Sequence, residues 1–200
     1  MVNWTVDIAQ IEKTLKNTLN ILNKCLAKYR VLGSVLVVAA SGKLHRNIKD
    51  IDILTEKSKL NCLVQNFKKQ GFKVKINKEL GMNIVASIFK KDFLKINLAL
   101  LGKFTSEGFT QSLPFIKTTK YIIGKTKFIG IPLEVQHYTM RKSKSKPGRS
   151  LDFHTLKNII SKDLTNNKYP ALVSIAGIPI PGAFSLFSSF KNSWEKQDFF

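Results

Sequence analysis

The segment Ile48–Leu54 constrains this chain most, because it alternates apolar and polar side chains in the way that a half-buried strand does. In a strand, Ile51 and Ile53 point into the core, whereas Asp50 and Asp52 point together to the opposite face. The Cα atoms of the two aspartates would then lie about 6.5 Å apart. Such a carboxylate pair repels itself unless a cation lies between its members. The segment therefore predicts a sheet that carries a candidate cation site.

Magnesium suits this pair, because Mg²⁺ is usually held by one or two carboxylates together with the phosphate oxygens of a substrate. In phosphoryl-transfer sites, metal ions stabilise both the attacking and the leaving oxygen. Asp50 and Asp52 are therefore our candidate catalytic residues and metal ligands.

A second feature is the turn Gly33-Ser34, which follows a short strand-like segment, Tyr29–Leu32. A glycine at a strand end lets the backbone approach a phosphate closely, and a helix after it would offer free N–H groups to a triphosphate. The apolar segment 35–41 fits a strand or a helix by its pattern alone, and this phosphate chemistry favours the helix. Gly33 and Ser34 are candidate nucleotide-binding residues.

Leu32-Gly33-Ser34 followed by Asp50-Ile51-Asp52-Ile53 resembles the nucleotidyltransferase superfamily, which includes DNA polymerase β and the minimal nucleotidyltransferases. The stretch from His45 to Asp52 looks most like the abortive-infection toxin branch, in which an Arg and a Thr-Lys pair commonly precede the two acids. Here Ile48 replaces the Thr. The strong part of the resemblance covers residues 29–54, and a weaker part extends to residue 160.

The resemblance implies transfer of a nucleoside monophosphate from an NTP, with magnesium bound by the paired aspartates and the triphosphate held at Gly33 and Ser34. Arg46 and Lys49, in the segment before the acids, are candidate phosphate-binding residues; the alternative is a solvated basic loop. The family often places a third carboxylate, the general base, on a later strand. This chain has Asn97 there. An amide cannot take a proton from an attacking hydroxyl, and Asp92 and Glu107 are the possible substitutes.

The amino-acid composition indicates which class of molecule would accept the nucleoside monophosphate. The 200 residues contain 33 Lys and Arg against 13 Asp and Glu, a formal net charge of +20. This charge favours a polyanionic partner such as RNA, with tRNA as one candidate, and the basic loop 142–149 would contact its backbone. The alternative is an ordinary set of solvated lysine-rich faces. Two other functions stay open: a nucleotidyltransferase fold that binds nucleotide or nucleic acid without catalysis, and transfer to a small molecule, which the basic charge disfavours.

The order of elements predicts an α+β fold, a small mixed sheet backed by helices, with C-terminal helices and an apolar irregular tail. Helical spacing runs through Ile8, Ile11, Leu15, Leu19, Leu22, Leu26 and Tyr29. Further helices are expected over 60–70, 134–141 and 151–163, and strands over 72–76, 83–89, 93–101, 115–123 and 127–133. We expect one domain over residues 1–165 and an extension over 166–200.

The extension has no charge from Tyr169 to Phe190, a length that would span a bilayer. Three prolines and two glycines in this stretch would interrupt a single helix, so we expect an irregular packed or partner-binding segment, with membrane contact as the alternative.

Cys25 and Cys62 form no CxxC pair and have no histidine cluster nearby, so a disulfide scaffold and a zinc finger are both unexpected. We expect two small buried hydrophobic side chains. The N-terminus lacks the pattern of a signal peptide, and a reducing cytoplasm is the expected compartment.

Overall fold

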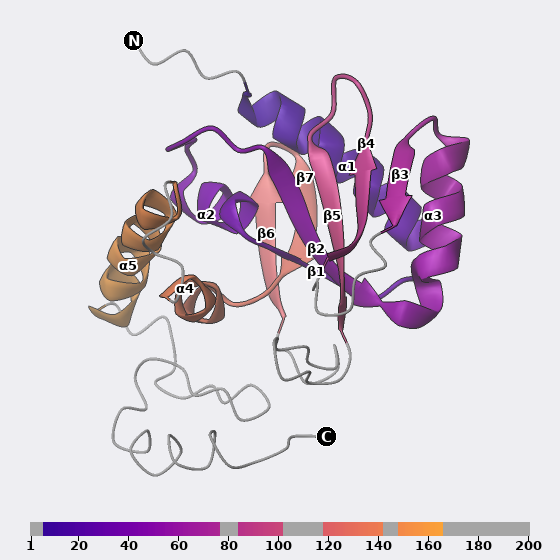
Figure 1. Ribbon diagram of the computed structural model, residues 1–200. Coiled ribbons are helices and arrows are strands. Elements are labelled where there is room, and N and C mark those ends of the chain that lie inside the picture. The colour runs from indigo at the N-terminus through magenta and orange to yellow at the C-terminus, as the bar shows by residue number, and fades with distance from the viewer. Residues whose placement is uncertain (1–5, 77–83, 102–117, 142–147, 166–200) are drawn as a thin grey trace, which may run out of the picture.

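The computed structural model describes residues 6–76, 84–101, 118–141 and 148–165 of the chain (Figure 1). The elements follow one another as α1 (Ile8–Lys24), β1 (Tyr29–Leu32), α2 (Ser34–Ser41), β2 (Asp50–Glu56), the 3-10 turn η1 (Lys57–Lys59), α3 (Leu60–Lys69), β3 (Lys73–Ile76), β4 (Ile84–Phe89), β5 (Lys95–Leu101), β6 (Thr119–Ile123), β7 (Thr126–Gly130), α4 (Leu133–Arg141) and α5 (Arg149–Thr165). Helices and strands are mixed along the chain, as the sequence predicts.

The strands form one mixed sheet in the order β3-β4-β5-β2-β1-β7-β6. Strand β2 pairs in antiparallel orientation with β1 and in parallel orientation with β5, and β1 is parallel to β7. The strand that carries the acidic pair is therefore an interior strand, flanked on both sides. The predicted α+β class, with a small mixed sheet backed by helices, is confirmed.

The helices pack in two groups. Helix α1 runs across the sheet and contacts α3, β6 and β7. On the left in Figure 1, α5 contacts both α2 and α4, and α2 also contacts β1 and β6. The C-terminal helices thus lie beside α2, the helix that begins at the Gly33-Ser34 turn.

Helix α2 confirms the helical alternative for segment 35–41. Residues Val35 to Val38 are all buried, so this helix is surrounded by apolar contacts. It begins at Gly33, and at its other end Gly42 adopts a left-handed conformation and donates its N–H to the carbonyl of Val38. Tertiary burial and the two terminal glycines outweigh the β propensity of the valines.

The first helix is shorter than its apolar spacing predicts. It ends at Lys24, and Leu26 has a φ of 50° and is 81% exposed. The N–H of Ala27 bonds back to the carbonyl of Leu22, which closes the helix end. Tyr29 belongs to β1. Leu26 and Tyr29 continued the helical spacing without belonging to the helix.

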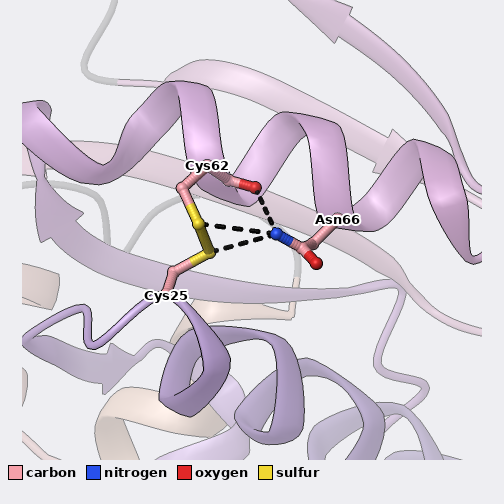
Figure 2. The surroundings of a disulfide bond; sticks show 3 residues. All are labelled: Cys25, Cys62 and Asn66. Atoms are coloured by element: carbon pink, nitrogen blue, oxygen red, sulfur yellow. Dashed lines mark hydrogen bonds between the residues drawn. A yellow bond between two sulfur atoms is a disulfide. The ribbon is translucent and has the colours of Figure 1, made fainter.

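Cys25 and Cys62 form a disulfide, so the prediction of two separate buried thiols is wrong (Figure 2). The S–S distance is 2.11 Å and the Cα atoms lie 5.9 Å apart, although 37 residues separate them in sequence. The bond joins the end of α1 to the first turn of α3, and the side-chain amide of Asn66 contacts both sulfurs. Because disulfides persist mainly in oxidising compartments, cysteine usage no longer supports a cytoplasmic location.

The remaining differences are at element ends. Strand β7 stops at Gly130 and Leu133 already begins α4, so the strand expected over 127–133 is shorter. Helix α5 begins at Arg149, which we expected in the basic loop. The rest of that loop (142–147), Glu107, the apolar tail and the whole extension 166–200 lie outside the described residues. Among the residues described, no helix is long and apolar enough to cross a membrane.

Candidate active site

The acidic pair lies on β2 as the alternation predicts. Ile51 and Ile53 are fully buried, whereas Asp50 and Asp52 are only partly buried and project from the other face. The isoleucines anchor the strand in the core, and this fixes the direction of both carboxylates.

Asn97 joins the two aspartates. In the parallel register of β2 and β5, Asn97 lies opposite Asp52 and is only 2% exposed. Its side-chain nitrogen donates to Asp50 Oδ2 at 3.0 Å and to Asp52 Oδ1 at 2.9 Å. The two carboxylates therefore converge on a single point, at present the amide nitrogen of Asn97.

The other end of the Asn97 amide faces strand β4. Ser87, opposite Asn97 in the antiparallel β4–β5 pair, donates its hydroxyl to Asn97 Oδ1 at 3.3 Å. Ser87 is itself buried, so the amide lies between the carboxylates and a hydroxyl, away from bulk water.

Gly33 brings the turn after β1 against the acidic pair. Its φ is 83°, and a Cβ added to it would lie 3.0 Å from Asp52 Oδ2. A glycine adopts this conformation without strain and leaves room beside the carboxylate, whereas any other residue would be strained there. The Gly33 N–H donates to the buried Gln136 side chain of α4 at 2.7 Å, which fixes the turn from the other side.

A second polar cluster lies next to the turn and centres on Asp152 of α5, which is fully buried. Ser34 Oγ donates to Asp152 Oδ2 at 2.6 Å, and His45 Nε2 lies 2.6 Å from Asp152 Oδ1. Arg46 holds both carboxylate oxygens, Oδ1 through Nε at 2.9 Å and Oδ2 through Nη2 at 2.6 Å. Arg46 Nη2 also donates to Ser34 Oγ. Turn, loop and C-terminal helix therefore meet at one carboxylate.

No protein-family model matches the sequence, and a search of curated proteins finds no match. Solved structures do match. The lincosamide antibiotic adenylyltransferase LnuA, with lincomycin bound, gives a TM-score of 0.61 at 18% identity over 74% of this chain and 97% of that chain. The antibiotic-resistance factor ANT(2'')-Ia gives 0.61 at 10% identity over 96% and 100%. An antigenic nucleotidyltransferase-like protein from Paracoccidioides brasiliensis gives 0.52 at 12% identity over 77% of each chain.

The chain has the nucleotidyltransferase fold. This confirms the fold that the resemblance of Gly33-Ser34 and the two aspartates implied. The narrower likeness to the abortive-infection toxins stays a prediction.

Ser34 and Arg46 both contact Asp152: the hydroxyl of Ser34 donates to its carboxylate, and the guanidinium of Arg46 pairs with the same group. That these two residues bind a nucleotide stays a prediction. At this turn the backbone N–H groups at the start of α2, rather than the Ser34 hydroxyl, are the groups suited to a phosphate. Lys49 is exposed, one residue before the acidic pair.

Asp52 and Asp152, which lie on either side of the Gly33-Ser34 turn, have pKa values that are shifted in opposite directions. Burial raises the pKa of Asp52, and the neighbouring Asp50 raises it further, while Asn97, Arg149 and Lys95 lower it. Burial also raises the pKa of Asp152, but hydrogen bonds from His45, Arg46 and Ser34 outweigh it and lower that pKa to about 2. Asp152 is therefore charged at neutral pH and anchors the structure, whereas the Asp52 carboxylate gains from an added cation.

The residues at the acidic pair fit a magnesium ion in part. Two carboxylates that converge on one point supply the hard oxygen ligands that Mg²⁺ prefers, with the remaining positions left for substrate phosphates and water. A third acid is not beside them: within the described part of the chain, no group of three His, Cys, Asp or Glu residues could hold a metal. Asp92 lies in the β4–β5 turn with a φ of 65°, so it does not occupy the position of Asn97.

The sequence predicted no role for Asp152, the residue on which the second polar cluster centres. The only local signal was a histidine next to an arginine, His45 and Arg46, in a loop that leads into an acidic strand. Their acceptor lies more than a hundred residues further along the chain, and no spacing rule connects them.

Proposed function

We propose that this protein transfers a nucleoside monophosphate from an NTP to a hydroxyl acceptor in a magnesium-dependent reaction. The observation that carries the proposal is the convergence of Asp50 and Asp52 on one point beside Gly33, at the start of helix α2. A cation site next to a phosphate-binding turn is the arrangement that phosphoryl transfer needs.

In this proposal each part of the site has one role. Asp50 and Asp52 hold Mg²⁺, which when bound neutralises phosphate charge and polarises the phosphoryl oxygens. The turn at Gly33 and the first N–H groups of α2 orient the triphosphate, and Lys49 adds a cation nearby. The acceptor oxygen attacks the α-phosphorus, its proton passes to solvent or a base, and pyrophosphate leaves as the bond to the α-phosphorus breaks.

The acceptor class is the finer part of the proposal. The net charge of +20 supports a polyanion, and RNA, including tRNA, is our first candidate. A small hydroxylated molecule is the second. It is supported by the likeness, over nearly their whole length, to LnuA, a lincosamide antibiotic adenylyltransferase, and to ANT(2'')-Ia, an antibiotic-resistance factor.

Asn97 supports a third possibility, which is nucleotide binding without transfer. An amide cannot accept the proton of the attacking hydroxyl, and in the structure it lies at the point where the two carboxylates converge. Water would then be the proton acceptor for any reaction, and a slow rate is expected.

The test uses NTPs labelled at the α-phosphate, with Mg²⁺ and either total RNA or a panel of hydroxylated antibiotics that includes lincomycin and tobramycin. We expect label on one acceptor class with the wild type and none with an Asp50→Asn/Asp52→Asn double variant. Asp92→Asn, a matched change in the β4–β5 turn, should keep full transfer. Equal labelling by wild type and double variant rejects the proposal, and nucleotide binding with no label on any acceptor favours the binding-only function.

A further inference from the structure

Asn97 is a neutral side chain that contacts both carboxylates through a single atom. Its amide nitrogen lies 3.0 Å from Asp50 Oδ2 and 2.9 Å from Asp52 Oδ1, and each of its two hydrogens serves one carboxylate. The side chain is nearly inaccessible to water, so these bonds are not exchanged for bonds to solvent. In the absence of a cation, the amide therefore holds the pair together.

The same arrangement opposes a cation. The hydrogens of the amide carry positive charge and point into the space between the carboxylates, where a divalent ion would have to bind. The opposite end of the amide is a carbonyl oxygen, which is a hard ligand of the kind that Mg²⁺ accepts. A half-turn of the amide about its terminal torsion exchanges the two ends without moving the backbone, and that torsion is broad and roughly two-fold.

Ser87 makes this half-turn inexpensive. Its hydroxyl now donates to Asn97 Oδ1 at 3.3 Å, but a hydroxyl can donate or accept. After the half-turn, the Ser87 oxygen can accept from the amide nitrogen, so neither end of the buried amide is left without a partner. A buried apolar residue at position 87 would not allow this exchange.

We propose that Asn97 is a reversible ligand whose amide turns when a divalent cation binds. Without the cation its nitrogen bridges Asp50 and Asp52, and with the cation its oxygen joins their carboxylates as the third ligand. Ser87 is the positioning residue that accepts the freed nitrogen. The proposal rests on the proposed magnesium site and adds that cation binding and amide orientation are one coupled event.

The first test observes the amide itself. Nitrogen-15 NMR of the full chain, without nucleotide, follows the Asn97 side-chain NH₂ signals, which are assigned by their loss in Asn97→Asp. We expect both signals to shift as Mg²⁺ is added, with the same midpoint as the heat of Mg²⁺ binding measured by calorimetry. Mg²⁺ that binds without moving these signals, or an absence of Mg²⁺ binding at millimolar concentration, overturns the proposal.

The second test uses variants with Mg²⁺ affinity as the readout. Asn97→Asp supplies a charged oxygen and needs no turn, so affinity should rise by about tenfold or more, because ligand charge count sets affinity. Asn97→Leu keeps the size but has no oxygen, and Ser87→Ala has no acceptor for the turned nitrogen; both should weaken binding by about tenfold, the effect of losing one such polar contact. Thermal unfolding confirms that each variant folds. Unchanged affinity in folded Asn97→Leu contradicts the proposal.

These readouts separate this inference from the proposed function. If label is transferred to an acceptor while the amide signals stay fixed, only the inference fails. If the amide turns with Mg²⁺ but no acceptor is ever labelled, the inference stands and the transfer reaction is wrong.

Discussion

Asp152 accepts hydrogen bonds from Ser34, His45 and Arg46 with no exposed surface of its own. We expect Asp152→Asn to lower the free energy of unfolding by about 3 kcal/mol, because removing one partner of a buried ion pair leaves the other charge uncompensated. Urea unfolding at neutral pH measures this loss. Asp92→Asn, in a hairpin turn, is the matched control and should change stability by less than about 0.5 kcal/mol. A loss no larger than that of the control would contradict the role of Asp152.

The same carboxylate sets a pH dependence. The pKa of Asp152 is about 2 in the folded chain against an ordinary value of 3.8, so its stabilising contribution is complete above pH 3.8 and is lost as the pH falls toward 2. We expect the stability of the wild type to fall more steeply over this interval than that of Asp152→Asn. Parallel acid-unfolding curves for the two proteins would show that Asp152 is not the responsible group.

The contribution of Asp52 to stability depends on pH in the opposite direction to that of Asp152. Because its pKa is raised in the folded chain, its ionised form costs stability above that pKa and costs nothing once it is protonated in acid. We expect Asp52→Asn to raise the melting temperature at neutral pH, to leave it unchanged in acid below the ordinary aspartate pKa, and to abolish nucleotidyl transfer. Calorimetric melting at both pH values tests this. A lower melting temperature at neutral pH would mean that the carboxylate stabilises the fold.

Among single residues, the sequence predicted the two aspartates that share a strand but not Asp152, which is distant in sequence. Asp50 and Asp52 could be predicted because a strand has a period of two. Asn97 was expected at the third position only through the resemblance, and its contact with both aspartates depends on the β2–β5 register. Asp152 could not be found, since nothing in the sequence indicates which surface α5 covers.

At the scale of elements, the connection from β1 to α2 depends on Gly33. Gly33→Ala would strain a φ of 83° and bring a Cβ to 3.0 Å from Asp52 Oδ2. We expect a loss of about 1 to 3 kcal/mol in stability, typical of a forced backbone conformation, and a large loss of transfer activity.

Gly42→Ala is the control for this prediction. Gly42 ends the same helix with a φ of 70°, and an added Cβ there would meet nothing within 4 Å. It should cost about 1 to 2 kcal/mol through strain alone and leave transfer activity intact. If both variants lose transfer activity equally, the short distance between Gly33 and Asp52 does not explain the loss in Gly33→Ala.

The succession of elements was largely predictable, because β1, β2 and the β4–β5 hairpin each carry their own local pattern. Helix α2 was predicted from the phosphate chemistry of the turn before it, since its apolar pattern also fits a strand. The errors have one cause. The helical spacing through Leu26, the strand expected to run to Leu133, and the two supposedly independent cysteines all depended on where neighbouring elements pack. Local periodicity does not contain that information, and tertiary contacts set the ends of elements.

At the scale of the whole molecule, the Cys25–Cys62 bond fastens α1 to α3 on the side away from α5. A cross-link between residues 37 apart is expected to contribute about 3 to 4 kcal/mol by restricting the unfolded chain. Urea unfolding with and without a reductant should show this difference. The Cys25→Ser/Cys62→Ser variant should have the unfolding free energy of the reduced protein, and the reductant should not change it. A variant as stable as the oxidised wild type would contradict the estimate.

The Asp152 cluster also has a consequence for biosynthesis. Ser34 and Asp152 are separated by 118 residues. A ribosome therefore releases the turn, the acidic strand and their cationic loop long before it releases their common acceptor. Until α5 emerges, the contacts of Arg46 and His45 with Asp152 cannot form. The contact between the Gly33-Ser34 turn and α5 is therefore expected to form late in translation, when the last described helix docks.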